Sequence, residues 1–278
     1  MQVHELAASR PFDFAKSLSF LCSFAPTRDE QRVEHGTLTK AFSHRGRAVV
    51  ARVEQRDDRL LATLDEPELL PRLREQLGLD DDVEGFYAKA DRAFRPVIAR
   101  LHGLHHVRFG TGAFEAACWA VLVQRTRIPI ARAQKARLVS ALGPTTDAFG
   151  ATFRAFPEPE AVLEAGADRL RDWVGPRGAA LFEIARAFAN VDPRFLREGP
   201  YDFVESWLRD LPRVGPWSAA FVLFRALGRM EHTPVDIGPI ARAAQTIYGG
   251  TEKEALSRAE HYGEHRGYWC YYLRAGVG

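Results

Sequence analysis

A succession of helical hydrophobic patterns, which begins near Val83 and runs to the carboxyl end, constrains the fold more than any other feature. Apolar residues recur there every three or four positions, as they do along one face of an α-helix. Gly and Pro interrupt the patterns and favour helix ends, at 143–144, 157, 159, 175–176, 199–200 and 215–216. The spacing predicts an all-α array over residues 91–278.

The first 90 residues carry shorter patterns of mixed period. A hairpin is expected where two β-compatible runs flank the turn-prone Arg56-Asp57-Asp58. The acidic residues 80–82 make an exposed break between Leu79 and Pro96, so we expect residues 1–90 to form an α+β domain with a small antiparallel sheet. Within it we predict strands over 38–42, 48–54 and 59–64 and a helix over 14–24.

The composition is that of a globular protein. With 278 residues, 46% of them hydrophobic and 27% charged, the chain can bury a core and differs from chains that stay disordered. Its 38 Lys and Arg residues against 36 Asp and Glu leave a net charge of +2, which by itself disfavours a histone-like polyanion-binding protein. Residues 116–146 are an exception, because they hold five basic residues and no acidic one and so form a candidate basic surface.

The cysteine positions and the hydropathy limit the kinds of metal site, disulfide and cellular compartment that the sequence allows. Cys22, Cys118 and Cys270 lie far apart, so the sequence offers neither a disulfide framework nor a thiolate metal or iron–sulfur site. The longest apolar run, 116–123, is far shorter than the roughly 20 residues that cross a bilayer, and no targeting signal is visible. We therefore expect a cytoplasmic protein without a membrane partner.

Residues 203–224 are the most informative segment. One helical stripe ends at Leu211, residues 212–216 interrupt it, and a second stripe begins at Ala219. The pattern predicts a helix, a tight hairpin and a second helix. The first turn of such a second helix directs backbone N–H groups outward, where they suit a phosphate oxygen. An ordinary helical hairpin inside a bundle has the same periodicity, so periodicity alone leaves both interpretations open.

An isolated acid, Asp236, follows Trp217 by nineteen residues, at the start of a predicted helix. Taken alone, it is explained as a helix N-cap. Taken together, Leu211-Pro212-Arg213-Val214-Gly215 and this aspartate resemble the signature of the helix-hairpin-helix DNA glycosylase superfamily. That signature is a Leu-Pro-Gly-(Val/Ile)-Gly hairpin followed by a catalytic aspartate. Arg213 replaces the first hairpin glycine, and a positive φ there would cost about 1 kcal/mol.

Other segments extend the resemblance to most of the chain. Residues 114–128 are similar to the family's helix and turn that carry a Gln and the residue inserted into the duplex. Residues 11–21 resemble the opening of the AlkA-type 3-methyladenine glycosylases, and residues 262–268 resemble a segment near their carboxyl end. The resemblance implies a mainly α helix-hairpin-helix glycosylase fold with a small α+β amino-terminal domain.

The reaction that the resemblance implies is base excision from duplex DNA, in which the enzyme extrudes a damaged nucleotide and breaks its N-glycosidic bond. Asp236 would stabilise the positive charge that develops on the sugar and orient the attacking water. Bifunctional members carry a lysine where this chain has Trp217, and none of its five lysines lies within 203–242. The expected enzyme is therefore monofunctional and leaves an abasic site. Neither a metal nor another cofactor is implied.

Trp217, Phe221 and His265 match positions that form the base pocket of the AlkA type, where electron-rich rings attract cationic alkylated bases. Arg125 is the candidate to fill the gap left by the flipped nucleotide. Simpler roles stay open: core packing for the Trp217 and Phe221 rings, a surface or supporting role for His265, and a solvated helix end for Arg125. The Gly175-Pro176-Arg177-Gly178 turn is interpreted as structural. The implied DNA-contacting residues are Gln124, Arg125, Thr126, Arg127, Arg213, Val214, Gly215 and Trp217.

The preferred hypothesis is a monomeric, nucleoid-associated glycosylase for alkylated purines such as 3-methyladenine. Phe221 and His265 stand where the AlkA type carries a tyrosine and a tryptophan, so excision of an oxidised or deaminated base is the alternative within this class. A non-catalytic lesion-binding protein is the alternative outside it, and the retained Asp236 argues against that alternative.

Overall fold

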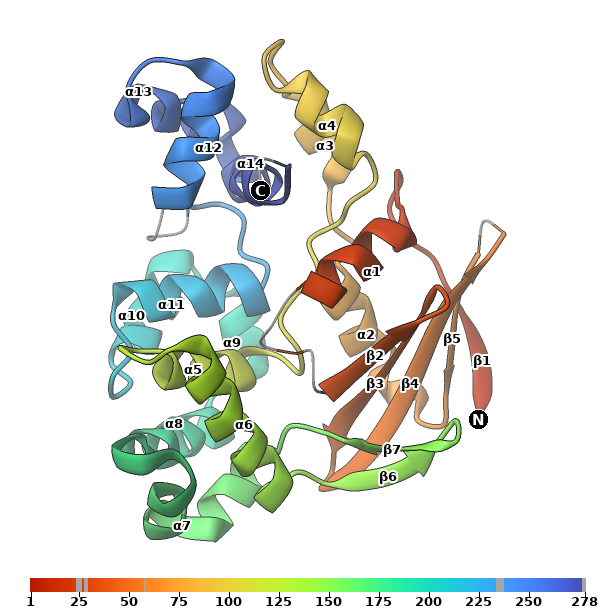
Figure 1. Ribbon diagram of the computed structural model, residues 1–278, viewed down its shortest axis with the longest axis vertical. Coiled ribbons are helices and arrows are strands. Elements are labelled where there is room, and N and C mark those ends of the chain that lie inside the picture. Colours follow the sequence, from red (N-terminus) through yellow and green to blue (C-terminus); the bar gives the residue numbers. More distant parts are fainter. Residues whose placement is uncertain (24–26, 28–29, 58, 234–237, 277–278) are drawn as a thin grey trace.

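A computed structural model describes residues 1–23, 27, 30–57, 59–233 and 238–276. An antiparallel sheet from the first 64 residues lies beside two groups of helices, one above the other in Figure 1. Each helical group has its own apolar core, and the sheet contributes to a third. The predicted fold class, mainly α with a small amino-terminal sheet, is confirmed.

The sheet contains β1 (Gln2–Leu6), β2 (Gln31–Glu34), β3 (Thr37–His44), β4 (Arg47–Arg56) and β5 (Arg59–Leu64), and the helices α1 (Phe14–Ser23) and α2 (Leu70–Leu77) accompany it. The strand order is β1-β5-β4-β3-β2, with every neighbouring pair antiparallel. Arg56 pairs with Arg59 at the end of the β4–β5 ladder, so the predicted hairpin is confirmed. Phe14 of α1 and Leu73 of α2 pack with Leu38 and Phe42 of β3, because alternate strand residues point to one face.

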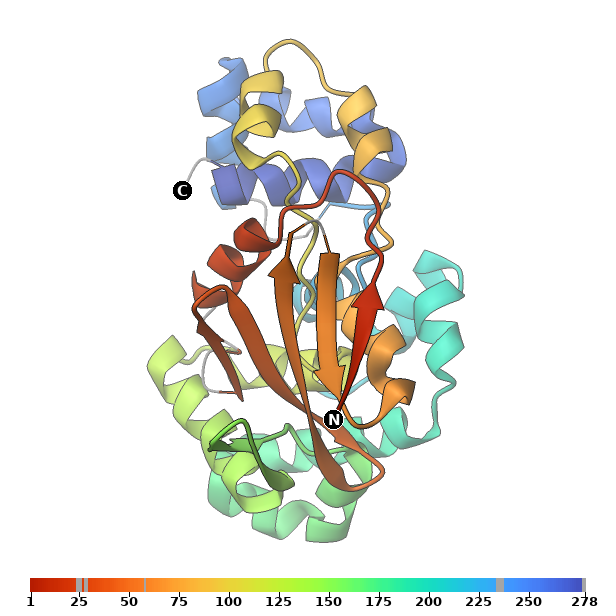
Figure 2. The same ribbon diagram turned by 90° about the vertical axis from the view of Figure 1, so that its right-hand side faces the viewer.

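A second hairpin, β6 (Thr145–Ala148) and β7 (Ala151–Arg154), packs on part of the opposite face of the sheet and is shown in green in Figures 1 and 2. The expectation of an all-α region over residues 91–278 is therefore wrong at this hairpin. Its turn residues, Phe149 and Gly150, have φ values of 49° and 75°, as a two-residue hairpin turn requires. Phe153 packs with Ala41 and Val50 of the sheet. Such a short hairpin is marginal alone, so this packing stabilises it.

The remaining helices form the two groups. α5 (Ala113–Leu122), α6 (Ile128–Leu142), α7 (Pro159–Val174), α8 (Gly178–Asn190), α9 (Pro193–Glu198), α10 (Tyr201–Arg209) and α11 (Pro216–Phe221), which continues as a π-helical turn (Val222–Ala226), form one group. α3 (Val83–Ala88), α4 (Arg95–Leu101), α12 (Gly238–Tyr248), α13 (Glu252–Ser257) and α14 (Arg266–Gly276) form the other. Short 3-10 helices span Pro67–Leu69, Gly175–Arg177 and Arg258–His265. Among the described residues, no helix is long and apolar enough to span a membrane.

A buried ionic cluster connects the sheet to the helices α5 and α6. Lys135 Nζ lies 2.6 Å from Glu30 Oε1 and 2.5 Å from Glu115 Oε1, and the Thr111 N–H and hydroxyl donate to Glu115 Oε2. Lys40 of β3 is fully buried nearby. Burial raises the pKa of Glu30 to about 7. Burial also opposes ionisation of Glu115, but Lys135 and Lys40 outweigh it and lower that pKa to about 2.

Candidate functional site

The predicted helix, hairpin and helix over 203–224 are present as α10, a tight loop and α11. Leu211 and Val214 are buried and anchor the loop, and the Val214 N–H donates to the Leu211 carbonyl at 3.1 Å. Gly215 is the N-cap of α11, and a Cβ added there would meet no atom within 4 Å. The first residue of α11, Pro216, has no N–H, so the backbone N–H groups that follow it in the first turn are those that α-helical hydrogen bonding does not use.

Arg213 adopts a left-handed backbone conformation, with a φ of 63°. The position that the superfamily gives to glycine thus has a positive φ here, although it carries a side chain. Such a conformation costs about 1 kcal/mol or more for a residue with a Cβ. The arginine side chain is exposed, so the strained residue adds a cation to the outside of the hairpin.

The loop between α5 and α6 lies against the hairpin. Gln124 Nε2 donates to the Arg213 carbonyl and, at 3.1 Å, to Ser218 Oγ. Gln124 and Arg213 line an open cavity of about 480 Å³ with Arg125 and Arg177. The structure therefore brings both predicted DNA-contacting segments to one arginine-lined depression, and the exposed guanidinium groups of Arg125 and Arg213 suit an anion.

Four of the predicted DNA-contacting residues have different surroundings within this region. Arg125 is exposed and, like Arg213, has a left-handed φ of 50°. Arg127 is exposed at the N-cap of α6. The Thr126 hydroxyl donates to the Gln124 carbonyl at 3.1 Å, so it holds the loop together. Val214 is only 4% exposed, and its side chain supports the hairpin from inside.

Trp217 and Phe221 form a stacked pair, with ring centroids 5.4 Å apart and an interplanar angle of 21°. Trp217 is 36% exposed, so part of its surface is open to solvent. Phe221 is half-buried and meets the ring of buried Phe109 edge-on at 5.8 Å. The indole of Trp217 therefore stacks on Phe221, which in turn contacts Phe109. Trp217 also precedes Ser218, whose hydroxyl accepts a hydrogen bond from Gln124.

His265 lies elsewhere. Its Nε2 is 3.2 Å from Asp82 Oδ2, and its ring stacks on Phe86 at 6.4 Å. The Gly85 backbone N–H and His265 lower the pKa of Asp82, which caps the amino terminus of α3. In the part of the chain that the structure describes, His265 therefore contacts α3 rather than the Trp217–Phe221 pair.

Asp236, the predicted catalytic carboxylate, lies outside the described residues. Its role stays a prediction. Across the described ranges, no group of three or more His, Cys, Asp or Glu side chains is arranged to hold a metal ion.

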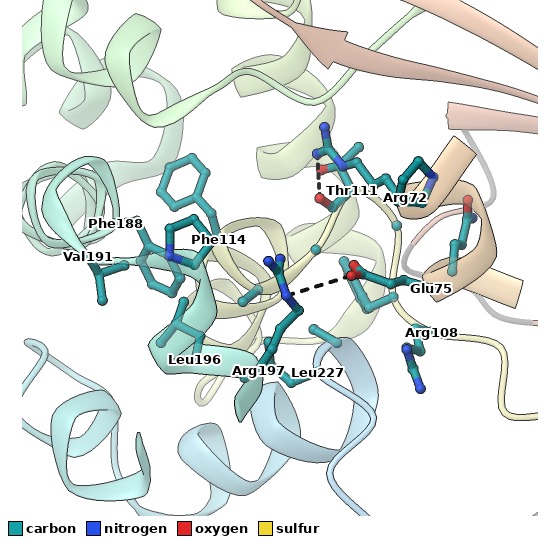
Figure 3. Close-up of a pocket in the computed structure, with 18 of the residues that line it drawn as sticks. Arg72, Glu75, Arg108, Thr111, Phe114, Phe188, Val191, Leu196, Arg197 and Leu227 are labelled. Carbon is teal, nitrogen blue, oxygen red and sulfur yellow. Dashed lines mark hydrogen bonds and ion pairs between the residues drawn. The ribbon is translucent and has the colours of Figure 1, made fainter. Parts of the chain in front are cut away.

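A second cavity, of about 420 Å³, was not predicted (Figure 3). It lies where α2, the start of α5, and α9 meet, and its apolar walls include Phe114, Phe188 and Leu196. Arg197 and Glu75 reach toward each other from α9 and α2, with Arg197 Nε 3.7 Å from a Glu75 carboxylate oxygen. Phe109 lines this cavity and also contacts Phe221, so a single ring separates the cavity from Phe221.

Sequence reasoning also missed the contacts of Arg177. Its guanidinium donates to the Val121 carbonyl at 3.2 Å, to the Gln124 carbonyl at 2.6 Å and to the Thr126 hydroxyl. The Gly175-Pro176-Arg177-Gly178 turn indicated a structural feature at this position. Its partners are more than fifty residues away in sequence, so no local pattern could identify them.

The order of the elements, with an amino-terminal sheet followed by helices that include a helix-hairpin-helix, is the fold of the helix-hairpin-helix DNA glycosylases. Among solved structures, the 3-methyladenine DNA-glycosylase from Archaeoglobus fulgidus is similar over 99% of this chain and 97% of its own, with a TM-score of 0.79 and 23% identity. The Clostridium acetobutylicum 8-oxoguanine glycosylase/lyase in complex with double-stranded DNA is similar over 99% and 97%, with a TM-score of 0.73 and 15% identity.

The resemblance to the AlkA-type enzymes is also confirmed by comparison of sequences. The DNA-3-methyladenine glycosylase of Bacillus subtilis (strain 168) is 26% identical over 216 residues, which cover 74% of this chain and 71% of that relative. No known family profile matches the chain.

Proposed function

We propose that this protein is a monofunctional DNA glycosylase of base excision repair that removes alkylated purines such as 3-methyladenine from duplex DNA. The similarity to DNA-3-methyladenine glycosylases supports the general activity. The observation that carries the substrate class is the exposed Trp217 ring, stacked on Phe221 beside the hairpin.

Binding of the duplex would use both loops. The hairpin offers backbone N–H groups to a phosphate, and Arg125 and Arg213 add cations that neutralise neighbouring phosphates. A purine nucleoside alkylated at N3 or N7 carries positive charge, so its flipped base gains from contact with the face of an indole ring. The near-neutral net charge of +2 is compatible with this interface, because residues 116–146 hold five basic residues and no acidic one, so the local charge there is positive.

Cleavage breaks the bond between the sugar C1′ and the base nitrogen. The electron pair of that bond leaves with the base, the sugar gains oxocarbenium character, and water adds its oxygen to C1′ and loses a proton. The carboxylate of Asp236 would stabilise the cation and accept or orient that proton. Trp217 occupies the position of the lysine of bifunctional members and has no amine that could attack C1′.

The test is incubation with methylated duplex DNA and chromatography of the released bases. Free 3-methyladenine or 7-methylguanine, an intact strand with an abasic site, and no covalent adduct on borohydride reduction are expected. Tight duplex binding without base release would instead identify a non-catalytic lesion-binding protein. The structural similarity to an 8-oxoguanine glycosylase/lyase makes a duplex with 8-oxoguanine the second substrate to assay.

Trp217→Ala is expected to slow release of a cationic methylated base by about 10- to 100-fold, because the base loses its cation–π and stacking partner. Phe203→Ala is the matched control, since this phenyl ring is 67% exposed on the preceding helix α10. Single-turnover rates on methylated duplex DNA measure both. Equal rates for Trp217→Ala and the wild type would remove Trp217 from the base pocket.

Arg213→Gly is expected to change stability and DNA affinity in opposite directions. Glycine relieves the left-handed φ of 63° and should stabilise the protein by about 0.5–1 kcal/mol. Loss of one phosphate-binding cation should weaken duplex binding and make the plot of log affinity against log salt shallower by about 0.9. Denaturant unfolding and fluorescence anisotropy at several salt concentrations measure these effects. Arg213→Lys, which keeps both the strain and the charge, should resemble the wild type.

A further inference from the structure

We propose that Arg177 is a positioning residue, which holds the loop 124–127 in its DNA-binding conformation and in register with the hairpin. This inference rests on the proposed function, because it assigns the loop a role in binding DNA. Its basis is the set of three hydrogen bonds that one guanidinium donates to Val121, Gln124 and Thr126.

Arg177 donates hydrogen bonds to backbone carbonyl groups at the carboxyl end of α5. The last carbonyl groups of an α-helix have no partner within it, and they lie at the negative end of the helix dipole. Val121 is within the last turn of α5, and Gln124 follows its C-cap, Val123. The Arg177 guanidinium donates to the carbonyls of Val121 and Gln124, and it is the planar, multidentate cation that can bind two such acceptors at once.

The loop needs such a restraint because its backbone is strained. Arg125 has a φ of 50°, a conformation that is unfavourable for a residue with a Cβ. Arg177 binds the residues on both sides of it, Gln124 through the carbonyl and Thr126 through the hydroxyl. The strained residue is therefore held between two fixed neighbours, with its side chain exposed.

Gln124 connects Arg177 to the hairpin. Gln124 accepts from Arg177 with its backbone and donates with its side chain to the Arg213 carbonyl and to Ser218 Oγ. Arg177, at the amino terminus of α8, thus links α8, the 124–127 loop and the start of α11. A displacement of the Gln124 backbone would disturb both DNA-facing segments.

Two glycines, Gly175 and Gly178, determine the backbone conformation of the turn that carries Arg177. Gly175 has a φ of 67° and a ψ of −145°, a combination that is essentially restricted to glycine. A Cβ on Gly178 would lie 2.5 Å from the Arg171 backbone nitrogen, so only glycine allows the start of α8 to approach the end of α7 this closely. These two glycines fix the backbone on both sides of Arg177.

The experiment compares wild type, Arg177→Ala and Arg177→Lys, with Arg186→Ala as control. Arg186 is an exposed arginine of the same helix, paired with Glu183. Hydrogen exchange of the 122–127 amides is measured in the free protein. Affinities are then measured for a duplex with a tetrahydrofuran abasic analogue and for the undamaged duplex, at several salt concentrations and below the unfolding transition of each variant.

We expect both Arg177 variants to accelerate exchange of the 122–127 amides, because neither Ala nor Lys reproduces the guanidinium fork. Their preference for the abasic duplex over the undamaged one should fall by about tenfold, since three hydrogen bonds from a charged donor are lost. The salt dependence of binding should not change. Arg186→Ala should behave like the wild type in every measurement.

Three results would overturn the inference. The first is wild-type behaviour of Arg177→Lys together with a shallower salt dependence in Arg177→Ala, which would identify Arg177 as a direct phosphate ligand. The second is unchanged amide exchange in both variants. The third is an equal loss of affinity for both duplexes, which indicates general destabilisation. If the wild-type protein releases no base from any lesion, the proposed function fails, and amide exchange still decides whether Arg177 holds the loop.

Discussion

Replacing Asp236 by asparagine is expected to reduce base release by about 10²- to 10³-fold, the scale on which loss of one preorganised electrostatic group slows an enzyme. The substitution keeps the size and shape of the side chain and removes its negative charge. Because the transition state develops positive charge on the sugar, the carboxylate stabilises it more than it stabilises the bound substrate. A neutral amide lacks this preference for the transition state. Single-turnover release of 3-methyladenine measures the rate, and affinity for the abasic duplex is measured in parallel.

Asp210→Asn is the matched control for Asp236→Asn. Asp210 is exposed at the end of α10, so the same chemical change there should leave the rate of base release close to that of the wild type. Unfolding by denaturant establishes that both variants are folded under the assay conditions. If Asp236→Asn releases base at the wild-type rate, another group provides the stabilisation and the assignment taken from the resemblance is wrong.

Lys135→Met is expected to destabilise the protein by about 3–5 kcal/mol, the effect of removing one partner from a buried ion pair. Glu115 is only 1% exposed, and its pKa of about 2 depends on the nearby lysines. Without Lys135, the buried carboxylate loses its nearest cation and must either remain charged without that partner or take up a proton. The free energy of unfolding from a denaturant titration measures the loss.

Lys89→Met is the control for this substitution. Lys89 makes a solvent-exposed ion pair with Glu264 at 3.5 Å, and such pairs contribute about 0–1 kcal/mol. A large difference between the two variants would assign the destabilisation to the buried cluster. Similar small losses in both would mean that the cluster contributes little to stability.

Local patterns in the sequence predict the parts of this fold that local interactions specify. The β4–β5 hairpin follows from the turn residues before Arg59, and the helix-hairpin-helix follows from the break after Leu211. The resemblance places a glycine at the position of Arg213, which made a positive φ there one of two possibilities, and the structure has this positive φ. In each case the decisive residues are neighbours in sequence.

Features that depend on distant segments could not be predicted. The β6–β7 hairpin is stabilised by packing of Phe153 on Val50, about one hundred residues away in sequence. The ionic cluster combines Glu30, Glu115 and Lys135 from separate elements. Likewise, the contacts of Arg177 with the 121–126 segment become visible only once α8 and the end of α5 lie side by side.

The position of the β6–β7 hairpin also limits which segments can be exchanged between related proteins to make a chimaera. The amino-terminal sheet has the appearance of an added module, since all five of its strands lie within the first 64 residues, before the two groups of helices (Figure 1). Yet Phe153 and Ala155, from the middle of the helical region, complete its outer face with Ala41 and Val50. A recombination breakpoint between residues 64 and 145 therefore separates two halves of one apolar contact. Only variants that inherit the sheet and this hairpin from the same parent keep that contact matched.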